Sequence, residues 1–233
     1  MMAILKFTQR ALTIGLLAAG LSACGTDDVS SSAAMQSYQV TIYNDTAAQA
    51  LSPVMLAIHD SAIQLWSIGA PASLALETLA EGGDASALVA MFNGKDVAML
   101  GAGAVGPGDT DSLMITAAAR HDMRLSLASM LVNSNDAFSG LNALDISKVM
   151  VGETLTYPLP AYDAGTEANS EAAGTIPGPA DGGEGFSAIR DDVMNKVSRH
   201  PGLVTQADDA ASVLMPQHRL SNQVGRVVIT RID

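Results

Sequence analysis

The sequence has 233 residues, with 12 Lys and Arg against 24 Asp and Glu, so its formal net charge is −12. A surface this acidic repels nucleic acid, which argues against nucleic acid as a partner. Aromatic residues make up only 4% of the chain, so a core has to be built from Ala, Val, Leu, Ile and Met.

The first 23 residues have the composition of a secretion signal. Residues 1–10 carry two basic side chains and no acid, and residues 11–23 are small and apolar. An apolar run of about 13 residues is too short to span a bilayer as a helix. The run ends in Leu-Ser-Ala-Cys24, which is similar to a bacterial lipobox, so Cys24 is expected to be lipidated and to anchor the protein in a membrane. The alternative is a chance cysteine after an ordinary signal peptide.

Removal of this signal takes away two basic residues and no acid, leaving 10 basic against 24 acidic residues and a net charge of −14. Residues 24–36 are small and polar and are expected to form a flexible tether. Residues 37–233 are long enough for one domain with a buried core. Gly25 is not the aspartate that often retains lipoproteins at the inner membrane, so an outer-membrane location is expected. The sequence does not distinguish the periplasmic face of that membrane from the surface face.

Alternating or continuous apolar residues predict a series of short strands. Ser73 opens a helical pattern that stops at Gly82, and Asp84 is expected to cap a second short helix through Phe92. Residues 187–221 are expected as an insertion, with a helical pattern over 188–200. The predicted strands are Ser37–Asn44, Pro53–His59, Val97–Leu100, Ser112–Ala119, Arg124–Val132, Thr154–Tyr162 and Gly225–Ile232.

Short strands separated by Gly, Pro and Asp turns predict an all-β fold. The expected architecture is an antiparallel β-sandwich of about eight strands, with one or two short helices in the connections. Pro158 and Pro160 place the strand Thr154–Tyr162 at an edge, because proline cannot donate to a ladder.

No catalytic pattern stands out, so the chain is not expected to be an enzyme. The GxGxxG match at residues 101–106 is followed by Pro107, which belongs to a turn rather than to a phosphate-binding helix. No histidine pair has the i, i+4 spacing of a helical zinc site, and no GxSxG elbow is present. His59, followed by Asp60, ends a predicted strand and is a candidate neighbour of a binding loop. The alternatives are a structural strand-end histidine and, less favoured, a hydrolase that uses His59.

Two acidic loops follow predicted strands. Asp136 comes after the strand ending at Val132, and Asp163 and Glu167 flank Gly165 after the edge strand. If the two strands are neighbours, both loops leave the same end of the sandwich. Carboxylates on tight loops suit calcium, which takes 6–8 oxygen ligands. The spacing leaves a second interpretation open, in which the carboxylates cap turns by accepting backbone hydrogen bonds.

Three sequence blocks resemble the spondin N-terminal (F-spondin) domain in order and spacing. They are HDSAIQLWSIGAPAS from His59, LVNSNDAFSGL around Asp136, and LPAYDAGTE around Asp163, within roughly residues 37–180. The resemblance implies a C2-like sandwich with calcium held by loops at one end, a role in adhesion or matrix binding, and no enzymatic activity. It identifies Asp136 and Asp163 as calcium ligands, and Glu167 stands where the family has a second aspartate.

The chain also departs from the family pattern. Tyr162 stands in place of one family tryptophan, and Phe138 lies one residue after the position of the family's other tryptophan. The family's cysteines are missing. The expected function is a lipid-anchored envelope protein whose calcium-binding sandwich binds a protein or glycan. The alternative is a metal-free structural envelope protein in which the acidic loops only cap turns.

Overall fold

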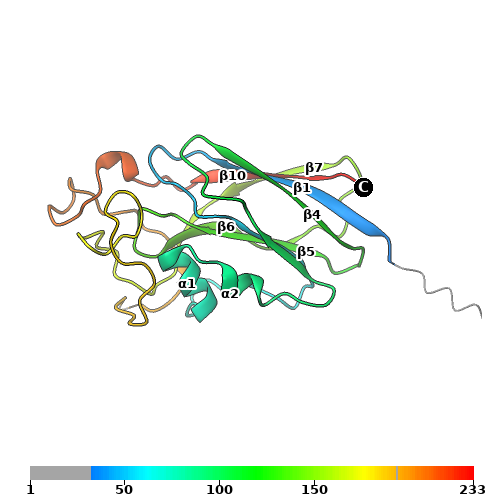
Figure 1. The fold of residues 1–233 in the computed structure, drawn as a ribbon, viewed down its shortest axis with the longest axis horizontal. Helices are drawn as coiled ribbons and strands as arrows, with labels where there is room; N and C mark the ends of the chain where they lie inside the picture. The colour runs from blue at the N-terminus through cyan, green and yellow to red at the C-terminus, as the bar shows by residue number, and fades with distance from the viewer. Residues whose placement is uncertain (1–32, 193) are drawn as a thin grey trace, which may run out of the picture. The chain divides into compact units, whose positions relative to one another are not determined.

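The computed structural model describes residues 33–192 and 194–233, and residues 33–233 form one compact unit. Its strands pair in two antiparallel sheets that face each other, so the predicted β-sandwich is confirmed (Figure 1). The four-stranded sheet has the order β4-β1-β10-β7, formed by Thr110–Ala118, Met35–Asn44, Gly225–Arg231 and Thr154–Leu159. The six-stranded sheet has the order β3-β2-β5-β6-β8-β9, formed by Val97–Leu100, Met55–His59, Arg124–Met130, Ala137–Asp145, Ala161–Asp163 and Ser198–Arg199.

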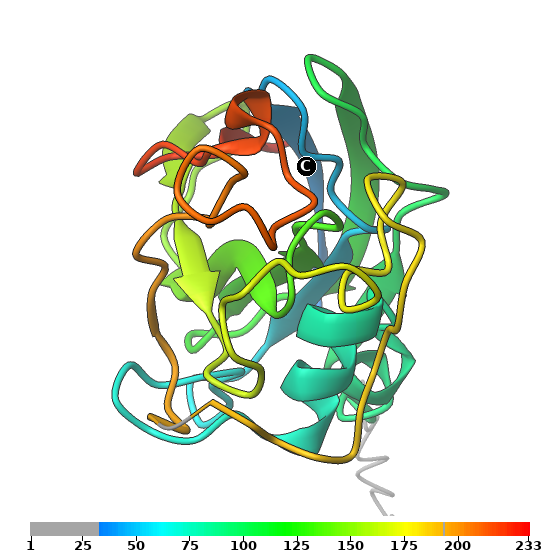
Figure 2. The same ribbon diagram turned by 90° about the vertical axis from the view of Figure 1, so that its left-hand side faces the viewer.

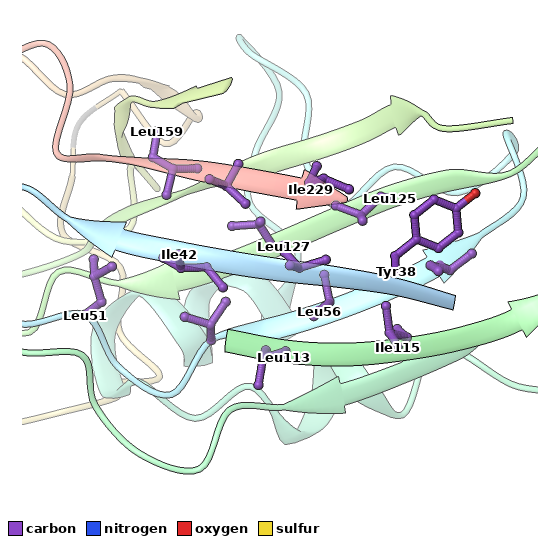
Figure 3. Packing of buried hydrophobic residues seen from close by; sticks show 14 of the residues in the cluster. Tyr38, Ile42, Leu51, Leu56, Leu113, Ile115, Leu125, Leu127, Leu159 and Ile229 are labelled. Atoms are coloured by element: carbon purple, nitrogen blue, oxygen red, sulfur yellow. The ribbon is translucent and has the colours of Figure 1, made fainter. Parts of the chain in front are cut away.

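The main core lies between the sheets and follows from period-two alternation. In β1, Tyr38, Val40 and Ile42 are fully buried, while the residues between them face outward. Leu113 and Ile115 of β4 repeat the pattern. Figure 3 shows these side chains directed toward those of β2 and β5. Aliphatic side chains fill nearly all of this interior, as the scarcity of aromatic residues predicts.

A second core lies on the outer face of the six-stranded sheet, under helix α1 (Leu74–Gly82). The Ser73 hydroxyl accepts from the Leu76 N–H at 3.2 Å, and Gly83 ends the helix in the left-handed conformation with φ of 70°. Leu76 and Leu79 are fully buried with Phe138 in this core. The six-stranded sheet is therefore covered on both faces, which explains why every residue of β2 is buried.

Three predicted elements differ from the structure. Helix α2 covers only Ser86–Val89, because the Met91 and Phe92 N–H groups donate to i−3 carbonyls and tighten the chain. The strand predicted at Thr154–Tyr162 divides at Pro160 into β7 and β8, which belong to different sheets. The helix predicted over 188–200 is wrong for the described residues 188–192 and 194–200, because their backbone bonds to other segments: the Asp191 N–H donates to Thr166 and the Val197 N–H to Ala70.

The sandwich has two distinct ends. Long connections between residues 164 and 224, which include a 3₁₀ turn at Pro216–His218, gather at the end where β5 stops and β6 begins (Figures 1 and 2). β1 begins at Met35, beside Ala118 and at the opposite end. Within the described part of the chain, no helix is long and apolar enough to cross a membrane.

Candidate metal centre

The loop that carries Asp136 is built into the sandwich rather than exposed on it. The Gln49 side chain bridges to Asn133, donating to its carbonyl at 2.7 Å and accepting from its N–H at 3.0 Å. The Ser134 hydroxyl donates to the Leu131 carbonyl and accepts from the Ala137 N–H, which closes the turn between β5 and β6. These contacts fix the loop, so the position of Asp136 is set by the fold.

Asp136 is fully buried, with 0% of its surface exposed. Its Oδ2 accepts from the Thr166 N–H at 2.7 Å, from the Glu167 N–H at 3.1 Å and from the Thr166 hydroxyl at 3.2 Å. Its Oδ1 has no hydrogen-bond partner among the described residues. Burial, and then the nearby charge of Asp163, raises the pKa of Asp136 to about 7.

Asp163 reaches the same place through strand pairing, because β8 lies beside β6 with Asp163 opposite Ala137. Its Oδ1 accepts from the Gly165 N–H at 2.6 Å and its Oδ2 from the Asn169 side chain at 2.7 Å. Burial raises the pKa of Asp163. The structure thus brings Asp136 and Asp163 together at one end of the sandwich.

Glu167 lies at the edge of the same cluster. Burial is the first cause of its raised pKa of about 8, followed by the charges of Glu81, Asp136 and Asp191. Its side chain lines a hollow of about 190 Å³ together with Asp191. Glu167 is therefore the carboxylate of this cluster that a solute can reach through a cavity.

The structure adds Glu171, which the sequence reasoning missed. Its side chain is 0% exposed, its Oε2 accepts from the Val204 N–H at 2.8 Å, and its Oε1 has no partner in the described chain. Burial, then the charges of Asp136 and Asp163, raises its pKa to about 7. Glu171 also has a φ of 46°, which is uncommon for a non-glycine residue. The sequence signal was a further acid four residues after Glu167.

The cluster is rich in oxygen acceptors and poor in positive charge. Three buried oxygens, on Asp136, Asn169 and Glu171, lack partners within the described residues. The ion pairs among the described residues involve other acids, such as Glu77 with Arg190. None of these pairs includes a carboxylate of the cluster, that is Asp136, Asp163, Glu167 or Glu171. The donor set is therefore all oxygen, as a hard divalent cation requires.

The side chains are nevertheless arranged for hydrogen bonding. In residues 33–192 and 194–233, no group of three or more His, Cys, Asp or Glu side chains has the arrangement that holds a metal ion. Asp136 and Asp163 are drawn toward backbone and amide donors instead. A bound cation would have to redirect carboxylates that now cap the two loops.

His59 and Asp60 are not brought to this cluster. His59 pairs with Arg124 at the start of β5, whereas Asp136 follows the end of that strand. The His59 ring is buried, with Nδ1 2.7 Å from the Asp60 carbonyl and Nε2 2.8 Å from the Ser126 hydroxyl. Burial lowers its pKa. These contacts describe a histidine held within the sheet end. Cys24 lies outside the described residues.

The comparison with known families agrees with the resemblance of the three blocks. The family model Spondin_N matches residues 36–176, which is more than half of the chain and includes all four clustered carboxylates. No protein of curated function is significantly similar to the chain. The sandwich, the order of the blocks and the matched family model lead to one conclusion: the chain belongs to the Spondin_N family.

Proposed function

We propose that this protein is a calcium-binding module that is held at the cell envelope by lipidated Cys24 and binds a protein or glycan. The observation that carries the calcium proposal is Asp136, a fully buried carboxylate with an unpartnered oxygen and no basic partner among the described residues. Membership of the Spondin_N family supports a binding role rather than a catalytic one. The lipobox-like sequence before Cys24 supports the anchor.

The electrostatics of the cluster favour a cation. Ionised carboxylates are costly to bury without a counter-charge, and the raised pKa values of Asp136, Glu167 and Glu171 express that cost. Calcium would supply the missing positive charge and accept oxygen ligands of mixed type. Asp136, Asp163 and Glu167 would hold it, and the free oxygen of Glu171 adds a fourth carboxylate.

A second function is favoured by the hydrogen bonds of the same residues. Asp136 Oδ2 already accepts three hydrogen bonds, and both oxygens of Asp163 are used. In a metal-free structural protein these carboxylates would tie the loop after β8 to the loop before β6. The two functions differ in what calcium does to the stability of the fold.

Thermal melts separate these two functions. Residues 25–233, which contain the whole compact unit, are melted in EDTA and in several millimolar calcium, because extracellular calcium modules often bind at about 10⁻⁴–10⁻³ M. Calcium binding predicts a higher melting temperature in calcium, because a ligand that binds only the native state stabilises it. The increase should vanish in the double variant Asp136→Asn with Asp163→Asn.

The matched control is Asp84→Asn, which changes an exposed aspartate that accepts from the Ser86 N–H and has no hydrogen bond to the clustered residues in the described chain. It should keep the full calcium effect. Equal melting temperatures of the wild type in EDTA and calcium would support the metal-free function instead.

A further inference from the structure

A cavity opens at one side of the sandwich, between edge strand β7 and strands β8 and β9 of the other sheet. Its volume is about 590 Å³, within the range of about 300–1,000 Å³ typical of small-molecule sites. Tyr157 and Tyr162 line it from β7 and β8, Arg199 and His200 from β9 and the residue after it, and Ser221–Gln223 closes it. It combines aromatic walls with several hydrogen-bond donors.

The cavity differs in charge from the rest of this acidic protein. No Asp or Glu is among the residues that line it, and Arg199 is its one formally charged side chain. The guanidinium of Arg199 lies over the Tyr162 ring, with 4.7 Å between its Cζ and the ring centroid. Within the described residues it has no carboxylate within ion-pair distance.

Arg226 also stacks on a tyrosine, but its charge is neutralised by an aspartate of the same protein. Its Cζ lies 4.0 Å from the centroid of the Tyr43 ring, and it donates to both oxygens of Asp45 at 2.6 and 2.8 Å. Both arginines stack on a tyrosine, but of the two only Arg226 donates to an acid among the described residues, through its Nη1. The corresponding donors of Arg199 are left for a ligand at the cavity.

His200 supplies a second unused donor. Its Nδ1 accepts from the Gly202 N–H at 3.0 Å, so the neutral ring carries its proton on Nε2. That Nε2 is buried and has no partner in the described part of the chain. Burial lowers the pKa of His200 to about 4, so the ring is neutral at pH 7 and Nε2 donates. Arg199 and His200 are neighbours in sequence and both border the cavity.

We propose that this cavity binds a small ligand through its carboxylate group. A guanidinium fork with free donors matches a carboxylate in geometry and charge, and the His200 ring borders the same cavity. Arg199, His200 and Ser221–Gln223 lie beyond the residues that the family model matches, and none of the clustered acids lines the cavity. The site is thus separate from the proposed calcium centre, and either can fail alone.

Such a carboxylate has two sources, a uronic acid of a glycan or the C-terminus of a peptide. Residues 25–233 are titrated by calorimetry and NMR with D-glucuronate and with N-acetyl-Ala-Ala, each against its neutral counterpart, D-glucose and the peptide amide. The proposal predicts that at least one acid binds and that its neutral counterpart does not. Whichever acid binds identifies the source. Failure of both acids, or equal binding of the neutral partner, overturns the proposal.

Variants and metal conditions complete the test. Arg199→Gln should weaken binding of the acid by at least about tenfold, because it removes a hydrogen-bonded charge. Arg226→Gln, which changes the neutralised stacked arginine, should leave the affinity unchanged. Arg199 is exposed, so a melt of the Arg199→Gln variant is expected to match that of the wild type. The affinity for the acid should be the same in EDTA and in calcium. Binding only in calcium would mean that the carboxylate of the ligand contacts the metal, and it would overturn the cavity site.

Discussion

At the scale of residues, the loop end of the sandwich is defined by buried acids that accept hydrogen bonds but have no basic partner among the described residues. Asp136 holds the loop after β8 through the N–H groups of Thr166 and Glu167. Its second oxygen, like one oxygen of Glu171, is buried without a described partner. Unpartnered buried polar atoms are rare in folded proteins, so these oxygens make the cluster a candidate site.

Replacing Asp136 should show how much it braces the loops. In Asp136→Ala, the buried Thr166 N–H and the part-buried Glu167 N–H lose their acceptor, and a buried donor left unsatisfied costs about 1–3 kcal/mol. Asp136→Asn keeps a side-chain oxygen and should cost less. Urea unfolding at pH 5 in EDTA gives both free energies of unfolding. A loss for Asp136→Ala no larger than that for Asp84→Ala, an exposed cap, would contradict this brace.

The raised pKa values predict how stability depends on pH without calcium. Asp136, Glu167 and Glu171 ionise from ordinary values of 3.8 to 4.5 when unfolded, but at about 7, 8 and 7 in the fold. Between these values the native state binds more protons, so stability should fall as the pH rises from about 4 to about 8. Melts in EDTA at pH 5, 6, 7 and 8 measure the decline.

If the proposed function holds, calcium should flatten that decline, because it would bind the ionised carboxylates and offset their repulsion. The double variant Asp136→Asn with Glu171→Gln serves as the control, because it removes two of the three raised groups and should show a smaller slope in EDTA. A melting temperature that rises between pH 5 and 8 in EDTA would contradict the assignment.

The sequence predicted part of this site. Asp136, Asp163 and Glu167 stood out because family blocks and turn chemistry surround them, and the structure places them in one cluster. Glu171 could not be predicted, since its burial depends on Val204, a residue more than thirty positions away that donates to it. His59 does not join the cluster, because it lies at the other end of the sheet. The sequence pattern shows that a histidine ends a strand, but not at which end of the sheet that strand ends.

At the scale of elements, the site exists because β6 and β8 are neighbours. The pairing of Ala137 with Asp163 brings the two loops together. β8 was predicted only as the end of a longer strand, and β6 was not predicted. β6 lacks clear alternation because the register shifts opposite Leu125 and Leu127, and Ala143 has a φ of 54°. Period-two patterns found β1, β4 and β10, where each face is regular.

Gly165 is the element-scale test of the loop after β8. It has a φ of 70°, and a Cβ there would lie 2.3 Å from the Lys196 carbonyl oxygen. Gly165→Ala should therefore destabilise the protein by more than the roughly 1–3 kcal/mol of an unfavourable backbone conformation alone. The control is Gly152→Ala, which has a φ of 79° and open space around the added carbon. Equal losses of unfolding free energy for the two variants would refute the close approach.

At the scale of the whole molecule, the start of the sandwich and the acidic cluster lie far apart. β1 begins at Met35, and the acidic cluster lies at the other end, beyond Met130 (Figure 1). A tether before β1 would therefore join the sandwich at the end away from the proposed calcium centre.

The anchor makes its own prediction. Cys24→Ala in the full chain should release the protein into the soluble fraction or leave an unprocessed precursor, because acyl chains on the proposed lipidated Cys24 would supply the membrane affinity. Fractionation of membranes followed by mass spectrometry of the N-terminus measures both. Cys24→Ser removes the same thiol and should behave alike. Unchanged membrane retention of either variant would contradict lipidation.

Calcium binding by the clustered carboxylates is the proposal on which the function of this protein rests. Its most direct test is an isothermal titration of residues 25–233, freed of metal by EDTA and dialysis, with calcium up to several millimolar at pH 7.5. The proposal predicts saturable binding at one site, with a dissociation constant at or below about 10⁻³ M, accompanied by proton release from carboxylates with raised pKa values. The absence of saturable heat in this range, with the protein shown to be folded, would contradict the claim.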